Sequence, residues 1–233
     1  MIAEADRKTI TEIAREYRVG KVVLFGSSLR EGREPNDIDL GVKGIEPRLF
    51  FRFYGELLMR LSKPVDVVDL AYRSRFTELV ERDGVGSMPQ LRERVLAEKE
   101  NVELALANLR QAMARKDRSV VELTAAASFV HNVYNGIENI LKQVLVARSV
   151  DVPKAGAWHQ ELLRLSVTEK VVSNELAQEL KEYLGFRHFF VHGYGFMISE
   201  EPLQDLASRL PAVWAKFTSE IEHALTVSGP DIQ

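Results

Sequence analysis

Residues 26–42, GSSLREGREPNDIDLGV, decide the fold of the N-terminal third of the chain. The run KVVLF at 21–25 precedes them, and its apolar and β-branched residues predict a buried strand that ends at the first quoted glycine. The segment DIDLGV at 37–42 predicts a second strand. Because side chains two positions apart share one face of a strand, Asp37 and Asp39 are expected side by side.

The turn between these strands has the composition of a phosphate-binding site. Gly26 lets the backbone approach a phosphate, a helix beginning there offers free N–H groups, and Ser27 adds a hydroxyl. Two adjacent carboxylates repel each other unless a divalent cation binds between them, and Mg²⁺ or Mn²⁺ shares such ligands with phosphates. We therefore expect a nucleoside triphosphate here. Arg30 and Arg33 are candidates for contacting it, with solvated loop charges as the alternative.

A third carboxylate is expected on a further strand, within KPVDVVDL at 63–70. Its two aspartates, Asp66 and Asp69, are three positions apart and face opposite sides of a strand, so only one of them can join the site. Asp66 is preferred because it lies near the start of the strand, and Asp69 remains the alternative. The competing interpretation makes the first two aspartates turn and cap residues that follow a Pro-Asn pair.

Helical and strand periods alternate through the first third of the chain. Helices predicted at 9–17, 48–61 and 74–84 join the three strands in a small α/β domain over residues 1–86. Beyond the turn-forming GVGSMP only helical periods remain, and they predict about five helices. These are 91–116, 119–149, 157–166, 173–192 and 205–225. The fold class is therefore α+β with two domains, the second being an all-α bundle over residues 88–226 before a flexible tail at 227–233.

Composition narrows the cellular setting. The 233 residues are 45% hydrophobic, enough for the cores of two small domains, and a net charge of −3 gives no global attraction to nucleic acid. The absence of cysteine excludes disulfides and thiolate metal sites. The charged N-terminus lacks the apolar run of a signal peptide, and no run has the length of a membrane span. We expect a cytoplasmic protein with no membrane partner.

A second group of polar residues ends the helix predicted at 173–192, in the stretch RHFFVHGYG at 187–195. Arg187 continues the apolar stripe of that helix, and an arginine there is costly to bury alone, so it is expected to reach a cleft or a partner subunit. His192 lies about 140° further around an ideal helix. The two side chains converge only if the helix unwinds at Gly193 or if a symmetry-related helix supplies the facing half of the site.

Arginine and histidine together are sufficient to cleave RNA without a metal. Histidine can move the protons of the ribose 2′-hydroxyl and the leaving oxygen, and arginine can stabilise the charge on the phosphate. His188 and Tyr194 are polar neighbours able to orient or bind. The structural alternatives make His192 a helix C-terminal cation and Arg187 an ion-pair partner of Glu138. Three further residues are expected to pack or hydrogen-bond: His131, Trp158 and His159.

The first domain resembles the minimal nucleotidyltransferases of the DNA polymerase β superfamily. The resemblance rests on the Gly-Ser pair, nine intervening residues, the string DIDL and the later VDVVDL. It implies metal-assisted transfer of a nucleoside monophosphate, AMP from ATP. The implied magnesium ligands and catalytic acids are Asp37, Asp39 and Asp66. The implied nucleotide-binding residues are Gly26, Ser27 and Arg30.

The bundle resembles HEPN domains, all-helical dimers that include ribonuclease toxins. RHFFVHGY fits the Arg-x-x-x-x-His-x-Tyr motif of HepT-like toxins, and FVHNVYNGIENILKQ and KAGAWHQELL resemble that family's second helix and following Trp-His segment. The resemblance implies a homodimer that cuts RNA with Arg187 and His192, supported by His188. In that family a separate nucleotidyltransferase adenylylates the motif tyrosine and silences the nuclease. Here both partners lie in one chain, as a fused toxin–antitoxin pair, so Tyr194 is the expected target.

Two other functions remain open. Antibiotic nucleotidyltransferases similar to the kanamycin enzyme also join such a catalytic domain to a helical bundle, and a protein of that kind would modify an aminoglycoside-like molecule. Alternatively, the bundle only dimerises the transferase. The Arg-x-x-x-x-His-x-Tyr string favours the nuclease over both alternatives, because neither of them requires it.

Overall fold

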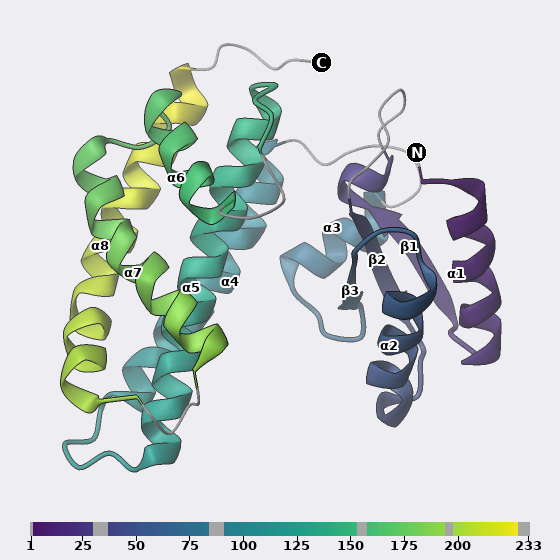
Figure 1. The fold of residues 1–233 in the computed structure, drawn as a ribbon, viewed down its shortest axis with the longest axis horizontal. Coiled ribbons are helices and arrows are strands. Elements are labelled where there is room, and N and C mark those ends of the chain that lie inside the picture. Colours follow the sequence, from purple (N-terminus) through teal and green to yellow (C-terminus); the bar gives the residue numbers. More distant parts are fainter. Residues whose placement is uncertain (1, 30–36, 84–90, 153–157, 194–197, 228–233) are drawn as a thin grey trace. The chain divides into compact units, whose positions relative to one another are not determined.

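The computed structural model divides into two compact units, residues 1–90 and 91–233, and each is described by itself (Figure 1). The structure describes residues 2–29, 37–83, 91–152, 158–193 and 198–227. The predicted domain boundary at 86–88 and residues 228–233 of the predicted tail fall outside these ranges, whereas Val227, the first residue of that tail, ends the last helix. None of the described helices is both long enough and apolar enough to cross a membrane.

The first unit is built on a three-stranded sheet in the order β1-β2-β3. β1 (Lys21–Phe25) is antiparallel to β2 (Ile38–Lys43), and β2 is parallel to β3 (Val65–Asp69). The central strand β2 buries its alternate apolar residues completely on one face, and Asp39 lies on the other face. The alternation of apolar and polar residues along the sequence of β2 therefore matches the alternation of its buried and less buried side chains in the structure.

Helices cover both faces of this sheet (Figure 1). α1 (Glu4–Glu16) and α2 (Phe50–Arg60) pack on the face formed by the buried residues of β2, and α3 (Arg75–Asp83) packs on the opposite face. A short 3-10 turn, η1 (Gly26–Leu29), follows β1, and another, η2 (Pro47–Leu49), leads into α2. Because β2 and β3 are parallel, a crossover must join them, and α2 forms it.

The second unit consists of helices only, within its described residues, and their number agrees with the periods in the sequence. They are α4 (Leu91–Ala112), α5 (Val120–Ala147), α6 (Trp158–Thr168), α7 (Asn174–His192) and α8 (Glu200–Val227). The start of α5 is fixed by a capping box, in which Ser119 Oγ accepts from the Glu122 amide at 3.3 Å and Glu122 Oε2 accepts from the Ser119 amide at 2.8 Å. α8 begins at Glu200, before its predicted start at 205, and contains Pro211.

α5 contacts each of the other helices of this unit. The stripe that its period predicts begins at Leu123, which is half-buried, and its other members are buried: Ala127, Val130, Tyr134, Ile137, Leu141 and Val144. Apolar residues of α7 and α8, including Leu180 and Phe217, complete the same core. A polar side chain on α5 can therefore meet groups from several elements at once.

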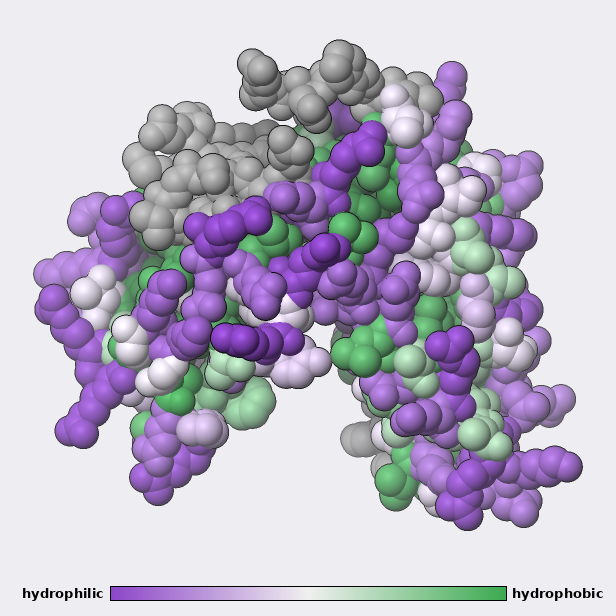
Figure 2. Space-filling view, turned by 180° about the vertical axis from the view of Figure 1, so that it is seen from behind, coloured by the Kyte–Doolittle hydropathy of each residue, from purple (hydrophilic) through white to green (hydrophobic). Residues whose placement is uncertain are grey.

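Hydrophilic side chains cover most of the face shown in Figure 2, and hydrophobic ones reach the surface in separate areas. In the first unit, α2 exposes Phe51, Leu58 and Met59, at 81%, 55% and 84% of their surface. Their spacing places them on one side of the helix. Phe53 and Leu57, which belong to the core, lie on the other side, so the exposed side of α2 adds nothing to the core of its unit.

Candidate functional sites

Asp39 and Asp66 occupy directly paired positions on β2 and β3. Paired residues on parallel strands present their side chains on the same face of the sheet. Asp39 is also paired with Phe25, the last residue of β1, which packs on the face that α3 covers. The two carboxylates therefore share that face, close to the end of β1. Asp37 lies two residues before Asp39, immediately ahead of β2.

The backbone of the turn after β1 lies directly against Asp39. Gly26 has a φ of +62°, and a Cβ atom added to it would be 2.5 Å from Asp39 Oδ2. A residue with a side chain would be strained by this backbone conformation and would also collide with the carboxylate. The glycine of the predicted phosphate-binding turn is thus adjacent to a predicted metal ligand.

Ser28 joins this turn to the acidic strand. Its hydroxyl accepts a hydrogen bond from the Asp39 amide at 3.0 Å and donates one to the Asp37 carbonyl at 3.4 Å. The side chain is almost completely buried. The sequence points to Ser27 and not to Ser28, whose only signal is its place as the second serine after a strand-ending glycine.

The strand register separates the two candidates for the third carboxylate. Asp69 is paired with Val42, and its Oδ1 accepts a hydrogen bond from the Ala71 amide at 2.8 Å in the turn after β3. Asp66 is exposed and paired with Asp39. The register therefore brings Asp66, and not Asp69, to the position beside Asp39.

The donors of this site are carboxylate oxygens, which suit a hard cation such as Mg²⁺. Within the described ranges, no group of three or more His, Cys, Asp or Glu side chains is close enough together to hold a metal ion. The arrangement is a pair, Asp39 and Asp66, with Asp37 two residues away, and phosphate oxygens would have to complete the coordination. The side chain of Ser27 and all of Arg30, which are predicted nucleotide contacts, lie outside the described residues.

In the helical unit, Arg187 on α7 forms an ion pair with Glu138 on α5, the structural partner that the sequence offered for it. Arg187 Nε lies 3.3 Å from Glu138 Oε2 and donates a 3.3 Å hydrogen bond to Asn135 Oδ1. The Glu138 side chain is only 5% exposed, so an ionised carboxylate there needs such partners. The terminal nitrogens of Arg187 make no hydrogen bond within the described part of the chain, and two such N–H groups can bind an anion in a fork.

The same carboxylate holds a histidine from α6. His159 Nδ1 lies 2.8 Å from Glu138 Oε1, and the Tyr134 hydroxyl also hydrogen-bonds to Glu138. The imidazole packs against the Trp158 ring, with centroids 3.6 Å apart and the planes tilted by 32°. Glu138 therefore joins side chains from α5, α6 and α7. His159, predicted to pack or hydrogen-bond, is a direct neighbour of the Arg187 ion pair.

Burial sets the protonation of this network. It raises the pKa of Glu138 to about 7, and the charge of Arg187 and the hydrogen bond from Tyr134 oppose that effect. Burial also lowers the pKa of His159 to about 4, as do the charges of Arg187 and His188. The imidazole is therefore neutral at pH 7. Because Arg187 favours an ionised Glu138, His159 is assigned the tautomer that donates from Nδ1, which leaves the lone pair on Nε2.

A second histidine is fixed through Asn135. The Asn135 amide donates from Nδ2 to His131 Nε2 at 2.9 Å, while its Oδ1 accepts from Arg187. Burial, and then the charge of Arg187, lower the pKa of His131. Its ring packs against Phe190, with centroids 5.1 Å apart. His131 thus has the packing and hydrogen-bonding role that the sequence predicts for it.

Within one chain, Arg187 and His192 do not converge. α7 stays helical through His192 and ends at Gly193, so the helix does not unwind early enough to turn the histidine toward the arginine. The exposed His192 ring lies instead 4.7 Å from the ring of His188, one turn earlier. Of the two arrangements predicted to bring Arg187 close to His192, early unwinding of the helix is therefore ruled out, and pairing with the helix of a second chain remains. Tyr194 lies outside the described residues.

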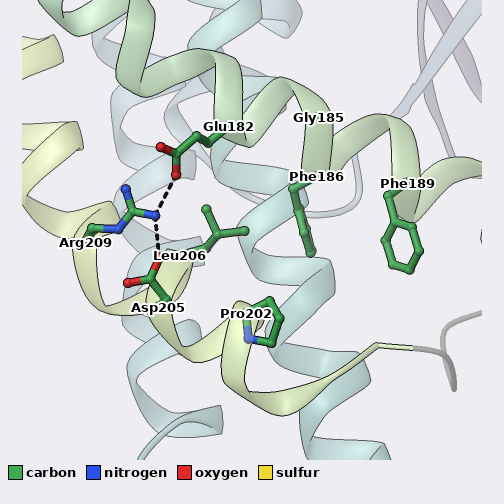
Figure 3. A pocket seen from close by; sticks show the side chains of 8 residues that line it. All are labelled: Glu182, Gly185, Phe186, Phe189, Pro202, Asp205, Leu206 and Arg209. Carbon is green, nitrogen blue, oxygen red and sulfur yellow. Dashed lines mark hydrogen bonds and ion pairs between the residues drawn. The ribbon is translucent and has the colours of Figure 1, made fainter.

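A separate, open pocket of about 370 Å³ lies between α7 and α8 (Figure 3). Arg209 stands between two carboxylates, 2.6 Å from Glu182 and 2.5 Å from Asp205. Phe186 and Phe189 line another part of it. The pocket contains none of the residues that the sequence singles out, and its arginine is already paired with carboxylates, so we do not assign it to either site.

The helical unit matches a known family, and several solved structures are similar to the chain. Residues 125–227 match the family model described as HepT-like protein, and no curated protein matches the chain. YutE from Bacillus subtilis, a cytosolic protein of unknown function, is 18% identical, with a TM-score of 0.50 over 61% of this chain and 95% of its own. A tri-AMPylated Shewanella oneidensis HEPN toxin in complex with MNT antitoxin is 12% identical, with a TM-score of 0.46 over 60% of this chain and 99% of its own.

A toxin–antitoxin structure with AMP-PNP is 10% identical, with a TM-score of 0.46 over 57% of this chain and 97% of its own. At 18% identity the similarity to YutE concerns the fold alone, and TM-scores of 0.46 are too low to add to it. The family match is more specific, because it covers all of α6, α7 and α8 and nearly all of α5. These helices include Glu138, His159 and Arg187. Residues 125–227 are a HepT-like domain of the HEPN type.

Proposed function

We propose that the chain combines two enzymes: a nucleotidyltransferase that attaches AMP to Tyr194, and a HEPN-type endoribonuclease that this modification silences. One observation carries the proposal. The same chain has two aspartates paired on neighbouring strands, Asp39 and Asp66, of which Asp39 lies against the backbone of Gly26. It also has a HepT-like domain whose Arg187 has terminal N–H groups available for an anion. Either feature alone would fit several functions.

The ribonuclease half uses Arg187 and His192. Because Glu138 and Asn135 hold Arg187 at Nε, its terminal nitrogens are left for a phosphodiester of RNA. His192 would act with the arginine of a second copy, in a homodimer, with His188 beside it. Arginine would stabilise the charge on the phosphate while histidine moves the protons, so this reaction requires no metal.

The transferase half uses the acidic face of the sheet. Its expected metal ligands are Asp37, Asp39 and Asp66, and its expected phosphate contacts are Gly26, Ser27 and Arg30. Mg²⁺ or Mn²⁺, when bound, would neutralise and polarise the triphosphate of ATP. In the transfer, the phenol oxygen of Tyr194 bonds to the α-phosphorus, the bond from that phosphorus to the bridging oxygen breaks, and pyrophosphate leaves. The phenolic proton is lost to solvent.

The position of the acceptor explains how transfer would silence the nuclease. Tyr194 follows His192 by two residues. An AMP group there adds an anion next to the end of α7. That anion can occupy the terminal nitrogens of Arg187 and so exclude the phosphate of RNA.

Mass spectrometry after incubation with ATP and Mg²⁺ tests the transfer directly. The peptide that contains Tyr194 should gain AMP in the wild type and should stay unmodified in Asp39→Asn. Asp69→Asn is the matched control, because that carboxylate caps the turn at Ala71 and is not paired with Asp39. An unmodified wild-type peptide would contradict the transferase assignment.

Growth of cells that express the protein tests the coupling of the two activities. Asp37→Ala with Asp39→Ala should slow growth, because the nuclease is no longer silenced, and adding His192→Ala should restore it. A loss of aminoglycoside resistance without a growth defect would favour the antibiotic-modifying enzyme instead. Unchanged growth and resistance would leave the helical unit as a scaffold.

A further inference from the structure

We propose that His159 is a catalytic residue of the ribonuclease site, where its Nε2 accepts the proton of the attacking ribose 2′-hydroxyl beside the phosphate held by Arg187 of the same chain. This inference rests on the proposed ribonuclease function and adds to it a second histidine, outside the Arg-x-x-x-x-His-x-Tyr string. Each chain then contains both an arginine and a base, and His192 is left to protonate the leaving 5′-oxygen.

One carboxylate fixes both groups. Glu138 binds Arg187 through Oε2 at 3.3 Å and His159 through Oε1 at 2.8 Å. Since both contacts use the two oxygens of a single carboxylate, the guanidinium and the imidazole are close neighbours. His192, by contrast, lies about 140° around α7 from Arg187. Within one chain, His159 is therefore better placed than His192 to act with Arg187.

The orientation of the imidazole leaves one atom available for chemistry. Its Nδ1 hydrogen is directed at Glu138, so Nε2 is the acceptor, and Nε2 makes no hydrogen bond within the described residues. The side chain is 19% exposed, and its ring packs against the Trp158 ring at an interplanar angle of 32°. A carboxylate in this position holds the tautomer of a histidine, with Nδ1 as the donor and Nε2 as the acceptor.

The protonation state and the substrate agree with this role. Burial and nearby cations lower the pKa of His159 to about 4, so Nε2 is unprotonated at neutral pH. A 2′-hydroxyl is a donor that DNA lacks, and an acceptor beside the phosphate therefore selects ribose. The O2′ proton passes to Nε2, O2′ bonds to phosphorus, the bond from phosphorus to O5′ breaks, and O5′ takes a proton from His192. The products are a 2′,3′-cyclic phosphate and a 5′-hydroxyl.

RNA cleavage by full-length protein tests the assignment. All variants carry Asp39→Asn, which prevents the proposed self-modification, and are made by cell-free synthesis to avoid toxicity. His159→Gln is compared with His223→Gln, a matched change at an exposed histidine on α8. Glutamine can still donate to Glu138 but cannot take up a proton. We expect His159→Gln to lower kcat about 10²- to 10⁴-fold with little change in KM, and His223→Gln to cleave normally.

The outcomes separate this inference from the function on which it rests. Normal cleavage by His159→Gln, or a defect confined to KM, would overturn the role of His159, because a residue that only positions Arg187 would weaken RNA binding. Two results would overturn the ribonuclease proposal itself. One is that the Asp39→Asn parent does not cleave RNA at all, and the other is that His192→Gln cleaves it normally. Thermal unfolding of each variant checks the fold, and His159→Asn replaces His159→Gln if that variant unfolds.

The pH profile gives an independent readout. Because the pKa of Glu138 is itself raised to about 7, the profile is measured on Glu138→Gln, whose amide oxygen can still accept from His159 Nδ1 but does not titrate. With a base that stays unprotonated well below neutral pH, kcat of this variant should stay level as the pH falls from about 7 to about 5. A base of ordinary histidine pKa would lose most of its activity over this range. If kcat falls steeply between about pH 7 and about pH 5.5, and falls in the same way in His159→Gln, the base is another residue.

Discussion

The Glu138 carboxylate interacts with side chains from three helices. Burial disfavours its charge, and the donors that offset this cost are Arg187, His159 and the Tyr134 hydroxyl. Asn135 connects the same network to His131, since its amide accepts from Arg187 and donates to the imidazole. The electrostatics of the HEPN-type site are therefore set by groups outside the motif that contains Arg187 and His192.

The opposing pKa shifts of Glu138 and His159 predict how the free energy of unfolding depends on pH. The raised pKa of Glu138 adds stability that is full below its unfolded value of 4.5 and is lost as the pH rises through about 7. The lowered pKa of His159 acts with the opposite sign, because its cost grows as the pH falls from 6.5 toward about 4. The two effects oppose each other in the wild type over the shared range.

Replacing His159 should leave the pH dependence that Glu138 contributes to the free energy of unfolding. In His159→Gln, the free energy of unfolding should fall, relative to wild type, as the pH rises from about 5 to about 6.5. Urea unfolding at several pH values measures this difference, and His223→Gln serves as the control. A difference that is constant with pH would mean that the pKa of His159 is not lowered in the folded protein.

Gly26 is the second residue whose replacement has a clear expected effect. Gly26→Ala forces a left-handed conformation on alanine, at a cost of about 1–2 kcal/mol, and places its Cβ against Asp39 Oδ2. AMP transfer should be lost. Gly55→Ala is the matched control, since a Cβ there meets nothing within 4 Å in α2 and should stabilise the unit by about 0.5–1 kcal/mol. The two variants are compared by thermal unfolding and by the mass assay, and normal transfer by Gly26→Ala would contradict the site.

At the scale of elements, Gly136 allows α4 to approach α5 closely at one point. A Cβ on Gly136 of α5 would lie 2.2 Å from Val102 Cγ2 on α4. The helix propensity of alanine favours the substitution, whereas the packing of the two helices opposes it. Because interiors are close-packed, the collision is the larger effect.

Gly136→Ala should therefore lower the free energy of unfolding by about 1–3 kcal/mol. Gly185→Ala, in α7, is the matched control, because a Cβ there meets nothing within 4 Å, and it should be neutral or stabilising by up to about 1 kcal/mol. Urea unfolding monitored by helical circular dichroism measures both. Equal stabilities of the two variants would mean that α4 moves away from α5 at little cost.

The positions of elements were more predictable than their ends or their pairing. The stripe on α5 was read from the sequence because a helix repeats every 3.6 residues whatever lies around it. α8 begins five residues before its predicted start at 205, and its first turn contains the buried Leu203 together with Pro202, which the first turn of a helix tolerates. The place of Asp66 near the start of its strand favours it over Asp69, but only the register of β3 against β2 pairs it with Asp39.

At the scale of the whole molecule, each unit has a core of its own. The main cluster of the helical unit contains residues of the second unit only, and the clusters around the sheet contain residues of the first unit only. Each unit thus buries its apolar residues without help from the other. Two cores of this kind are expected to unfold as separate cooperative transitions.

Residues 91–233 expressed alone should therefore fold. We expect a helical circular dichroism spectrum and a cooperative thermal transition. In the same fragment, Phe217→Ala should cost about 3–5 kcal/mol, because that side chain is fully buried. Phe189→Ala, at a residue that is 46% exposed, is the control and should cost much less. A fragment that melts without cooperativity would show that its core needs the first unit.

The sequence by itself determined the strands and helices and the spacing of Asp37 and Asp39, because these follow from periods of two and 3.6 along one backbone. It also placed Arg187 and His192 about 140° apart around one helix. Only the tertiary structure decided that Asp66 faces Asp39, that Ser28 holds the acidic strand, and that Glu138 binds Arg187 and His159 together. Contacts between residues distant in sequence depend on how the elements pack, and no local pattern encodes the side-chain partners that packing brings within a hydrogen bond of each other.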